Sequence, residues 1–548
     1  MGLFNKILSN DFSDNLLKMT KNKFRVEIKS DRQINPFARS CTVCLPMPDL
    51  SDNRGDDRRL KEAVSEVTGI ADIVISLPVL REISGKLRAK GFSVEVVLVY
   101  NGYVWEVAEI RNPDDMLPLY GLAIDLGSTG IVFYLTDLKT GEVIDVHSIT
   151  NPQIPYGEDI LTRIYLAHTR EGLIKLQDAV LQGLKEAVLE LEYRNNFTMD
   201  SIFAMVVAGN TTMVHFFLGL SIETLCREPY IPAANRPGVI RNGEILLPMH
   251  KHGICYVLPN VGSYFGGDLL AGIIISEIYK SKDISVFLDV GTNAEAVIGN
   301  QDMLVVAAGS AGPGLEGGIL EHGMRAQNGA IDSVQINSKT LEISLSSIGN
   351  TKARGLCGSG AIDLLAQLLL AGLVDQSGTL RKERWPDRVI ETENGLAFVL
   401  VQDNETLIDN PITFSQRDIN NLLRSKGAMY AILTVLARTY GISFEEINRF
   451  YVAGNFGNHI NPESAISIGM LPEIPVERFT NIGNASGLGA VHVLLSIDDI
   501  DIIPEILEKI FYVEMNVQGD FMNELTASLF LPHTNRALFP GVWKRIEG

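Results

Sequence analysis

Apolar runs that end at a glycine turn recur along most of the chain and alternate with segments of helical spacing. Their length and their content of Val, Ile and Leu predict buried strands. The predicted strands cover 120–126, 201–208, 284–290, 303–308 and 450–453, and the longest predicted helices cover 171–192, 360–373 and 415–440. Strand, turn and helix in alternation predict an α/β fold. Because the pattern extends over more than 400 residues, we expect two α/β lobes, 120–280 and 281–548.

A smaller α/β pattern precedes the two lobes. Within residues 37–110, we expect strands at 71–75 and 92–100 and helices at 57–68 and 78–90. Two prolines and several charges make residues 111–119 a predicted linker. Residues 1–36 form a polar N-terminal extension whose first apolar positions suit a short amphipathic helix, either a surface or docking helix or a contact with a membrane surface.

Composition limits the classes of partner. The chain has 548 residues, 46% of them hydrophobic, which is enough for several cores, and its net charge of −19 repels nucleic acid and anionic lipid. A small anionic ligand such as a nucleotide can still bind, because backbone N–H groups and a metal ion act locally. No segment reaches the ~20 uninterrupted apolar residues of a membrane span.

The cysteines show no disulfide framework. There are five, an odd number, and only Cys41 and Cys44 lie close together. This usage, with no secretory signal at the start of the sequence, leads us to expect a reducing cytoplasm. The Cys41–Cys44 pair lies in a strand-like run at i, i+3, so its side chains should point to opposite faces.

Two segments of the chain resemble each other. Each is an apolar run that ends in Asp, an apolar residue, Gly and a hydroxyl residue, around Asp125 and Asp289. The pattern predicts a β-hairpin whose glycine permits a tight turn, and whose hydroxyl and N–H groups can hold phosphate oxygens. The aspartate can hold a hydrated Mg²⁺ against those phosphates.

Either hairpin alone has a simpler explanation, since Asp-x-Gly-Ser/Thr is also a common strand end with an Asx turn. Two copies, 164 positions apart, instead indicate an internally repeated fold.

The order of glycine motifs along the chain resembles that of the acetate and sugar kinase, heat-shock chaperone and actin superfamily. The motifs are the hairpin at 125–130, the turn at 207–212, the hairpin at 289–295, and the turns at 452–457 and 481–487. The resemblance implies a duplicated actin-like, sugar-kinase-like (ribonuclease-H-like) fold.

Further strings resemble the reductive activators of corrinoid (cobalamin-type) proteins. They lie at 46–52, 77–81, 151–159, 308–318, 355–360 and 531–533, and with the glycine motifs the resemblance covers roughly residues 40–545. It implies a Mg-dependent ATPase that returns a partner corrinoid protein of a methyltransferase system from Co(II) to Co(I). It also implies that ATP binds between the two lobes and that the protein forms a homodimer.

The resemblance assigns roles to individual residues. Asp125 and Asp289 would organise Mg²⁺ and the attacking water, with Asp268 and Glu295 as alternative water-positioning carboxylates that are otherwise helix-start or surface acids. Glu316 would either accept from the ribose hydroxyls or cap a helix. The expected phosphate contacts are Gly127, Ser128, Thr129, Gly130, Gly209, Asn210, Gly291, Thr292 and Asn293, and the expected ribose and adenine contacts are Gly309, Ser310, Gly312, Gly314, Gly317, Gly454, Asn455 and Gly457.

One departure from the family pattern concerns electron transfer. The activators carry an N-terminal [2Fe–2S] ferredoxin-like domain or another cysteine-ligated cluster, and such clusters need about four thiolates. We therefore expect no cluster of the chain's own and an external reductant such as a ferredoxin. A small-molecule kinase of the same superfamily and a non-enzymatic nucleotide-sensing scaffold stay open as alternatives.

Overall fold

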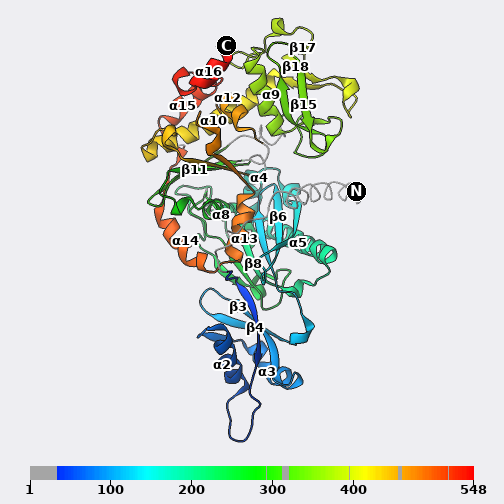
Figure 1. Cartoon of the computed structure of the whole chain (residues 1–548), viewed down its shortest axis with the longest axis vertical. Coiled ribbons are helices and arrows are strands. Elements are labelled where there is room, and N and C mark those ends of the chain that lie inside the picture. Colours follow the sequence, from blue (N-terminus) through cyan, green and yellow to red (C-terminus); the bar gives the residue numbers. More distant parts are fainter. Residues whose placement is uncertain are drawn as a thin grey trace. The chain divides into compact units, whose positions relative to one another are not determined.

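The computed structural model describes residues 34–263, 265–291, 293–310, 320–393, 395–454, 460–515 and 518–547 (Figure 1). These residues form two compact units. The first holds the described residues up to Ala271 together with Ser486–Leu507, and the second holds Gly272–Ala485 and the residues from Glu508 onward.

The first unit begins with a small α/β domain. Its sheet has the order β1-β3-β4-β2, from β1 (Ala38–Cys44), β3 (Ser93–Tyr100), β4 (Trp105–Arg111) and β2 (Ile73–Ile75). Helices α2 (Asp56–Thr68) and α3 (Leu77–Ala89) bury residues four positions apart against this sheet, such as Leu60 with Val64 and Ile83 with Leu87. The helices predicted for this region are confirmed, and the strand predicted at 71–75 begins at Ile73.

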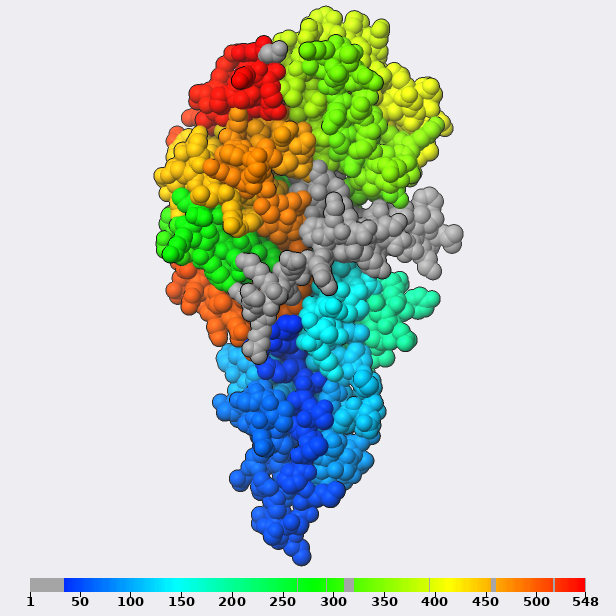
Figure 2. Space-filling view, in the orientation of Figure 1, coloured from blue at the N-terminus to red at the C-terminus, as the bar shows by residue number. Residues whose placement is uncertain are grey.

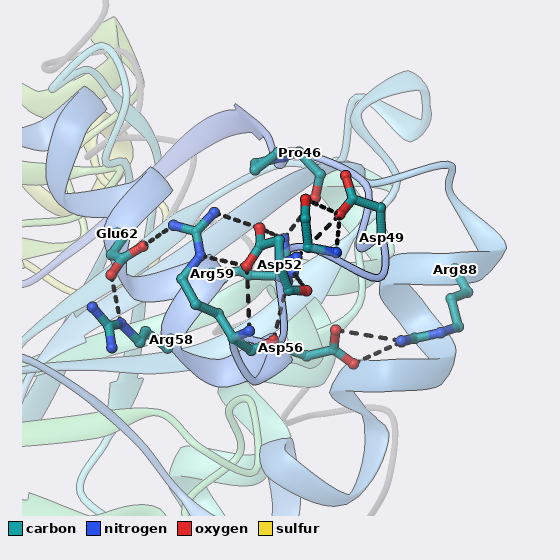
Figure 3. A network of polar contacts seen from close by, with 10 residues as sticks. Pro46, Asp49, Asp52, Asp56, Arg58, Arg59, Glu62 and Arg88 are labelled. Carbon is teal, nitrogen blue, oxygen red and sulfur yellow. Dashed lines mark hydrogen bonds and ion pairs between the residues drawn. The ribbon is translucent and has the colours of Figure 1, made fainter.

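A buried arginine supports the loop between β1 and α2 (Figure 3). Arg59 donates hydrogen bonds to the backbone carbonyls of Pro46, Asp52 and Arg54 at 3.3, 2.7 and 3.2 Å. Its guanidinium also lies 2.6 Å from the Asp52 carboxylate. The loop therefore has a defined conformation, although Met47 and Leu50 are exposed on it.

The larger sheet of the first unit has six strands. Its order is β7 (Val143–Thr150), β6 (Gly130–Asp137), β5 (Tyr120–Leu126), β8 (Ile202–Gly209), β10 (Ile254–Val257) and β9 (Gly238–Arg241). β5, β8 and β10 run parallel, so their carboxyl ends meet at one edge of the sheet. In open α/β sheets, ligands bind at this edge. The helices of this part are α4 (Ile160–Ala167), α5 (Arg170–Asn195), α6 (Thr211–Leu218), α7 (Asn242–Ile245), α8 (Gly267–Ser276), α13 (Ala485–Leu494) and α14 (Asp498–Lys509), of which α8 and α14 continue into the second unit.

The second unit repeats this pattern of strands. Its main sheet has the order β21 (Phe479–Gly483), β20 (Arg449–Ala453), β11 (Ser285–Val290), β12 (Asn293–Gly299), β13 (Leu304–Ser310) and β22 (Ile510–Tyr512). β11 lies between an antiparallel partner, β12, and a parallel partner, β20. β5 has the same environment between β6 and β8. The duplication inferred from the two aspartate hairpins is therefore present in the strand topology.

Two three-stranded sheets and several helices complete the second unit. The sheets are β15 (Ile343–Ser347), β14 (Ala330–Ile336) and β16 (Gly355–Leu356), and β17 (Val389–Thr392), β18 (Gly395–Val401) and β19 (Ile412–Ser415). The helices are α9 (Gly358–Leu370), α10 (Gln416–Tyr440), α12 (Pro462–Ser467), α15 (Phe521–Ser528) and α16 (Pro540–Glu547).

The observed elements confirm the predicted α/β class. The strand predicted at 120–126 is β5 without any shift, and the helix predicted at 415–440 is α10 within one residue. In the part of the chain that the structure describes, no helix has both the length and the hydropathy needed to cross a bilayer. The amphipathic helix predicted near the N-terminus lies outside the described residues.

Candidate functional site

Asp125 lies near the carboxyl end of β5. In the sheet it pairs with Val132 of β6 and Ala208 of β8. It therefore lies at the carboxyl ends of the parallel strands β5 and β8, next to the turn between β5 and β6. The Ser486 hydroxyl donates a 2.7 Å hydrogen bond to its Oδ1. The carboxylate is half-buried and fixed in orientation, as a metal or phosphate site requires.

The turn after Asp125 depends on its first glycine. A Cβ on Gly127 would lie 2.5 Å from the carbonyl oxygen of Gly130, too close for any side chain. The turn leads directly into β6, which begins at Gly130. Gly127, Ser128, Thr129 and Gly130 are all half-buried at this edge of the sheet.

Two residues, Asn151 and Arg163, bind the carbonyls of this turn. Asn151 Nδ2 donates to the Gly127 carbonyl at 2.8 Å, and the Asn151 backbone N–H donates to the Thr129 carbonyl at 2.9 Å. The buried Arg163 donates from Nη1 to the Ser128 carbonyl at 2.7 Å. The three carbonyls are thus engaged within the protein.

Asp268 approaches the same edge because two glycines precede it. A Cβ on Gly266 would overlap the backbone of Gly209 and Asn210, and one on Gly267 would lie 2.6 Å from Leu258 Cβ. This close packing brings the start of α8 to the ends of β8 and β10.

The Asp268 and Asp125 carboxylates influence each other. Desolvation by burial raises the pKa of Asp268 to about 6, and the negative charge of Asp125 raises it in the same direction, against a lowering hydrogen bond from the Leu269 N–H. Two carboxylates with one raised pKa favour an added cation at this site.

The glycine turn at 207–212 lies beside Asp125 and Asp268. A Cβ on Gly209 would lie 2.9 Å from the Leu126 carbonyl oxygen, which explains the close contact between β8 and β5. Asn210 caps α6, since its Oδ1 accepts from the Met213 N–H at 2.9 Å. Asn210 therefore has a structural role besides the predicted phosphate contact.

Ser486 is a residue of this site that sequence reasoning did not assign. It lies in α13, which packs closely because a Cβ on Gly487 would overlap the Tyr134 ring and one on Gly489 would overlap the Ala271 carbonyl. The sequence feature that could have pointed to Ser486 was the pair of glycines in the string 483–487. They indicated a turn, but not which side chain would reach Asp125.

In the second unit, Asp289 occupies the position on β11 that Asp125 has on β5. It pairs with Glu295 of β12 and Ala453 of β20, so the two acids are direct cross-strand neighbours. A Cβ on Gly454, whose φ is +89°, would lie 2.7 Å from Asp289 Oδ1. The glycine thus allows the backbone after β20 to approach this carboxylate.

Three other predicted residues of this unit have defined surroundings. Gly291 donates its N–H to the Asn293 carbonyl at 2.9 Å and closes the hairpin turn. Asn293 is exposed. A Cβ on Gly309 would lie 2.5 Å from Ile432 Cδ1 of α10, so helix packing accounts for this glycine. Outside the described residues lie Thr292, the Ser310 side chain, Gly312, Gly314, Glu316, Gly317, Asn455 and Gly457.

The oxygen ligands of the first unit suit Mg²⁺. Asp125 and Asp268 supply hard carboxylate oxygens, and no group of three or more His, Cys, Asp or Glu side chains gathers among the described residues. Mg²⁺ in nucleotide sites is held by one or two carboxylates, with phosphates and water completing the octahedron. The pair therefore fits a nucleotide-bound Mg²⁺.

The two neighbouring cysteines lie on β1, as expected, with their side chains on opposite faces. Cys41 is half-buried, and burial raises the pKa of its thiol to about 11, whereas Cys44 is exposed.

Three family models match the chain. They describe the RACo linker region at residues 27–115, the RACo middle region at 120–281, and the C-terminal domain of RACo, the ASKHA domain, at 283–543. None of these three models describes a ferredoxin domain.

Known relatives agree with these models. The corrinoid activation enzyme RamQ of Eubacterium limosum is 31% identical over 413 residues, which are 74% of this chain and 69% of RamQ. The [Co(II) methylated amine-specific corrinoid protein] reductase of Methanosarcina barkeri is 22% identical over 72% of this chain and 73% of its own. Among solved structures, a reductive activator for corrinoid, iron–sulfur protein has a TM-score of 0.87 and 36% identity over 93% of this chain and 82% of its own. The chain therefore belongs to the family of reductive activators of corrinoid proteins.

Proposed function

We propose that this protein couples ATP hydrolysis to the one-electron reduction of a partner corrinoid protein from Co(II) to Co(I), with the electron supplied by an external donor such as a ferredoxin. The observation that carries this proposal is the Asp125–Asp268 pair at the carboxyl edge of the first unit's sheet, in a chain of the corrinoid-activator family.

The first hairpin is proposed to bind phosphate. The carbonyls of the turn at 127–129 bind Asn151 and Arg163, so its N–H groups and the hydroxyls of Ser128 and Thr129 are the groups we assign to phosphate oxygens. Gly209 and Asn210 complete this surface.

The two carboxylates are proposed to act on the metal and on water. Asp125, oriented by Ser486, would bind Mg²⁺, and Asp268 would accept a hydrogen bond from the attacking water. Bound Mg²⁺ would neutralise charge that develops on the phosphate oxygens. Its positive charge would also lower the pKa of Asp268 and keep that carboxylate ionised at neutral pH.

The second hairpin is proposed to contribute in the same way. Asp289 would be a second Mg²⁺-organising carboxylate, with Glu295 directly across the strands and the turn at 291–293 in contact with phosphate. Gly454 lies against Asp289, so a backbone shift at Gly454 on nucleotide binding would change the surroundings of that carboxylate.

In this proposal, the free energy of ATP hydrolysis drives the transfer of one electron to the corrinoid cobalt. For a one-electron step, a tenfold change in the equilibrium constant corresponds to ~59 mV, or about 1.4 kcal/mol. Each 1.4 kcal/mol of hydrolysis free energy that is coupled to the transfer would therefore shift the equilibrium between Co(II) and Co(I) about tenfold. We also propose that the protein works as a homodimer, which light scattering of the purified chain would test.

The deciding experiment measures ATP turnover and Co(I) formation together, with a Co(II) corrinoid protein and a reduced ferredoxin added singly and in combination. We expect ATP turnover to rise when the corrinoid protein is present, and Co(I) to appear only with all components. The variant Asp125→Asn should lose both activities by about 100-fold or more. Asp178→Asn changes an exposed acid on α5 and is the matched control.

Two results would contradict the proposal and support an alternative function. Phosphorylation of a metabolite, detected by mass spectrometry without any need for a corrinoid protein, would identify a kinase. Partner binding that survives in Asp125→Asn and no longer responds to nucleotide, with no Co(I) formed by the wild type, would identify a scaffold.

A further inference from the structure

An apolar groove of about 630 Å³ lies on the first unit, apart from the residues assigned to nucleotide. α5 forms one wall, and the segments that lead into β8 and β10 form the other. Its apolar lining residues are Leu181, Met199, Leu246, Leu247 and Pro248. In Figure 1 α5 lies at the right-hand edge of the first unit, where Figure 2 shows the teal surface of this segment.

The groove lies at the amino edge of the sheet. Met199 comes just before β8, which begins at Ile202, and Leu247 and Pro248 come before β10. The nucleotide is assigned to the opposite, carboxyl edge of the same strands. The groove is therefore a second site, which shares no lining residue with the first.

Leu246 has an unusual conformation for a residue of its type. Its φ is +49°, in the left-handed region that residues other than glycine seldom adopt, and its side chain is 83% exposed. Asparagine or glycine would fit this backbone with less strain. A large apolar side chain at a strained and solvent-facing position favours a role in binding over a role in packing.

The sequence supplies an occupant of matching character. Residues 1–33, which precede the described residues, carry Leu3, Phe4, Ile7 and Leu8 on one face of the helix that their spacing predicts. An amphipathic helix binds an apolar groove through side chains spaced in this way.

Charge favours the same occupant. Residues 1–33 hold seven Lys or Arg against four Asp or Glu, whereas the whole chain has a net charge of −19. The lining of the groove has one acid and one base, which cancel, and the exposed Glu186 and Asp200, next to lining residues, are both acidic. The basic segment is therefore attracted to this part of the first unit.

The segment can reach the groove. Ile34, the first described residue, has its Cδ1 2.7 Å from where a Cβ on Gly141 would lie, in the turn between β6 and β7. Because Asp137 pairs with Tyr120 at the start of β5, this turn is at the amino edge of the sheet, as the groove is. The 26 positions from Leu8 to Ile34 span up to about 90 Å, whereas six strands ~4.8 Å apart span roughly 24 Å. A tethered segment has a high effective concentration, so even a weak contact fills the groove.

We propose that this groove binds the chain's own N-terminal segment, with Leu3, Phe4, Ile7 and Leu8 packed against Leu246 and the other apolar lining residues. The amphipathic helix predicted from the sequence is thereby assigned to docking on the first unit. The site is independent of the proposed nucleotide site.

Photo-cross-linking of the full chain tests the proposal. p-Benzoylphenylalanine in place of Phe4 forms a bond to whatever it contacts, and mass spectrometry locates that bond. We expect cross-links within one chain to residues 178–185 or 246–248. A mixture of isotope-labelled and unlabelled chains distinguishes them from cross-links between two copies.

Leu246→Asn is the decisive variant, because asparagine suits the left-handed backbone and only the apolar side chain is lost. We expect it to lower the yield of groove cross-links about fivefold or more, and Ile7→Asp to do the same from the side of the segment. Leu161→Asn, at an exposed leucine of α4 outside the groove, is the matched control and should not change the yield.

The proposal is overturned if the probe at position 4 cross-links only elsewhere on the chain, only between copies, or not at all. It is equally overturned if Leu246→Asn and Ile7→Asp both keep the wild-type yield. Loss of the groove cross-link when vesicles of anionic phospholipid are added, with cross-links to lipid in its place, would assign the segment to a membrane surface instead.

Discussion

The hydroxyl of Ser486 donates a 2.7 Å hydrogen bond to Asp125 Oδ1, although 361 positions separate the two residues. Both belong to the first unit, to which Ser486–Leu507 returns after the chain has built most of the second unit. The orientation of the first carboxylate therefore depends on a helix from the C-terminal part of the sequence.

Replacing this hydroxyl should impair function without unfolding the protein. A hydrogen bond to a charged group contributes about 1.5–3 kcal/mol, so we expect Ser486→Ala to lower ATP turnover about tenfold or more through the loss of Asp125 positioning. Ser486→Thr retains the hydroxyl and should recover most of the rate. Steady-state kinetics with both variants would measure this, and equal rates in Ser486→Ala and the wild type would contradict the positioning role.

The second prediction concerns the pH dependence of stability at Asp268. Its pKa is raised in the folded state to about 6, from an ordinary value of 3.8. The folded state therefore binds the proton more tightly, and the ionised form destabilises it. That destabilisation is full above about pH 6 and disappears as the pH falls toward the ordinary value.

Asp268→Asn removes the charge that causes this effect. In the absence of Mg²⁺ and nucleotide, we expect the variant to have a Tm higher than the wild type by on the order of 1–3 °C at about pH 7.5. The difference should shrink as the pH falls below about 6 and vanish only below about pH 3.8. Scanning calorimetry across this range is the measurement, and a difference independent of pH would show that charge is not its cause.

The fold was predictable wherever a local pattern decides the structure. The strand at 120–126 was predicted with its bounds because its apolar run ends at Gly127, and no side chain fits that turn. The helix predicted at 415–440 begins at Gln416, directly after its cap Ser415, and ends before Gly441. Both boundaries are set by residues that lie next to them in the sequence.

The candidate site was predictable only in part. Asp125 and Asp289 were assigned from their own hairpins, whereas the approach of Asp268 depends on two glycines packing against the ends of other strands. Contacts between segments far apart in sequence leave no periodic signal in either segment. The contact of Ser486 with Asp125 was missed for this reason.

Gly266 should tolerate no side chain. A Cβ there would overlap backbone atoms of Gly209 and Asn210, which cannot move without disturbing β8 and α6. We expect Gly266→Ala to lower the free energy of unfolding by about 1–3 kcal/mol and to reduce ATP turnover by displacing Asp268. Urea unfolding and an ATPase assay would measure both effects.

Gly85→Ala is the matched control for that substitution. Gly85 lies inside α3, where an added Cβ meets no atom within 4 Å. Alanine favours a helix over glycine, so this variant should be more stable by about 0.5–1 kcal/mol. A similar loss of stability in both variants would mean that overlap at Gly266 is not the cause.

Arg59 should anchor the loop between β1 and α2. Its side chain is 0% exposed and binds three loop carbonyls and the Asp52 carboxylate. Arg59→Leu leaves the three carbonyls without this donor, while the Asp52 carboxylate keeps Arg54, so we expect a loss of about 1–3 kcal/mol and faster amide exchange in residues 46–55. Arg58→Gln, at a side chain that is 68% exposed, should change neither. Unchanged exchange in Arg59→Leu would show that the loop holds its conformation without the arginine.

The return of Ser486–Leu507 to the first unit has a consequence for biosynthesis. During translation, the sheet around Asp125 emerges early, but α13 leaves the ribosome only after nearly nine-tenths of the chain has been made. Until α13 has been synthesised, the nascent first unit therefore lacks the helix that packs against β6 and α8. Fragments that stop before residue 485 would leave β6 and α8 uncovered there, and we expect them to need a chaperone or to aggregate.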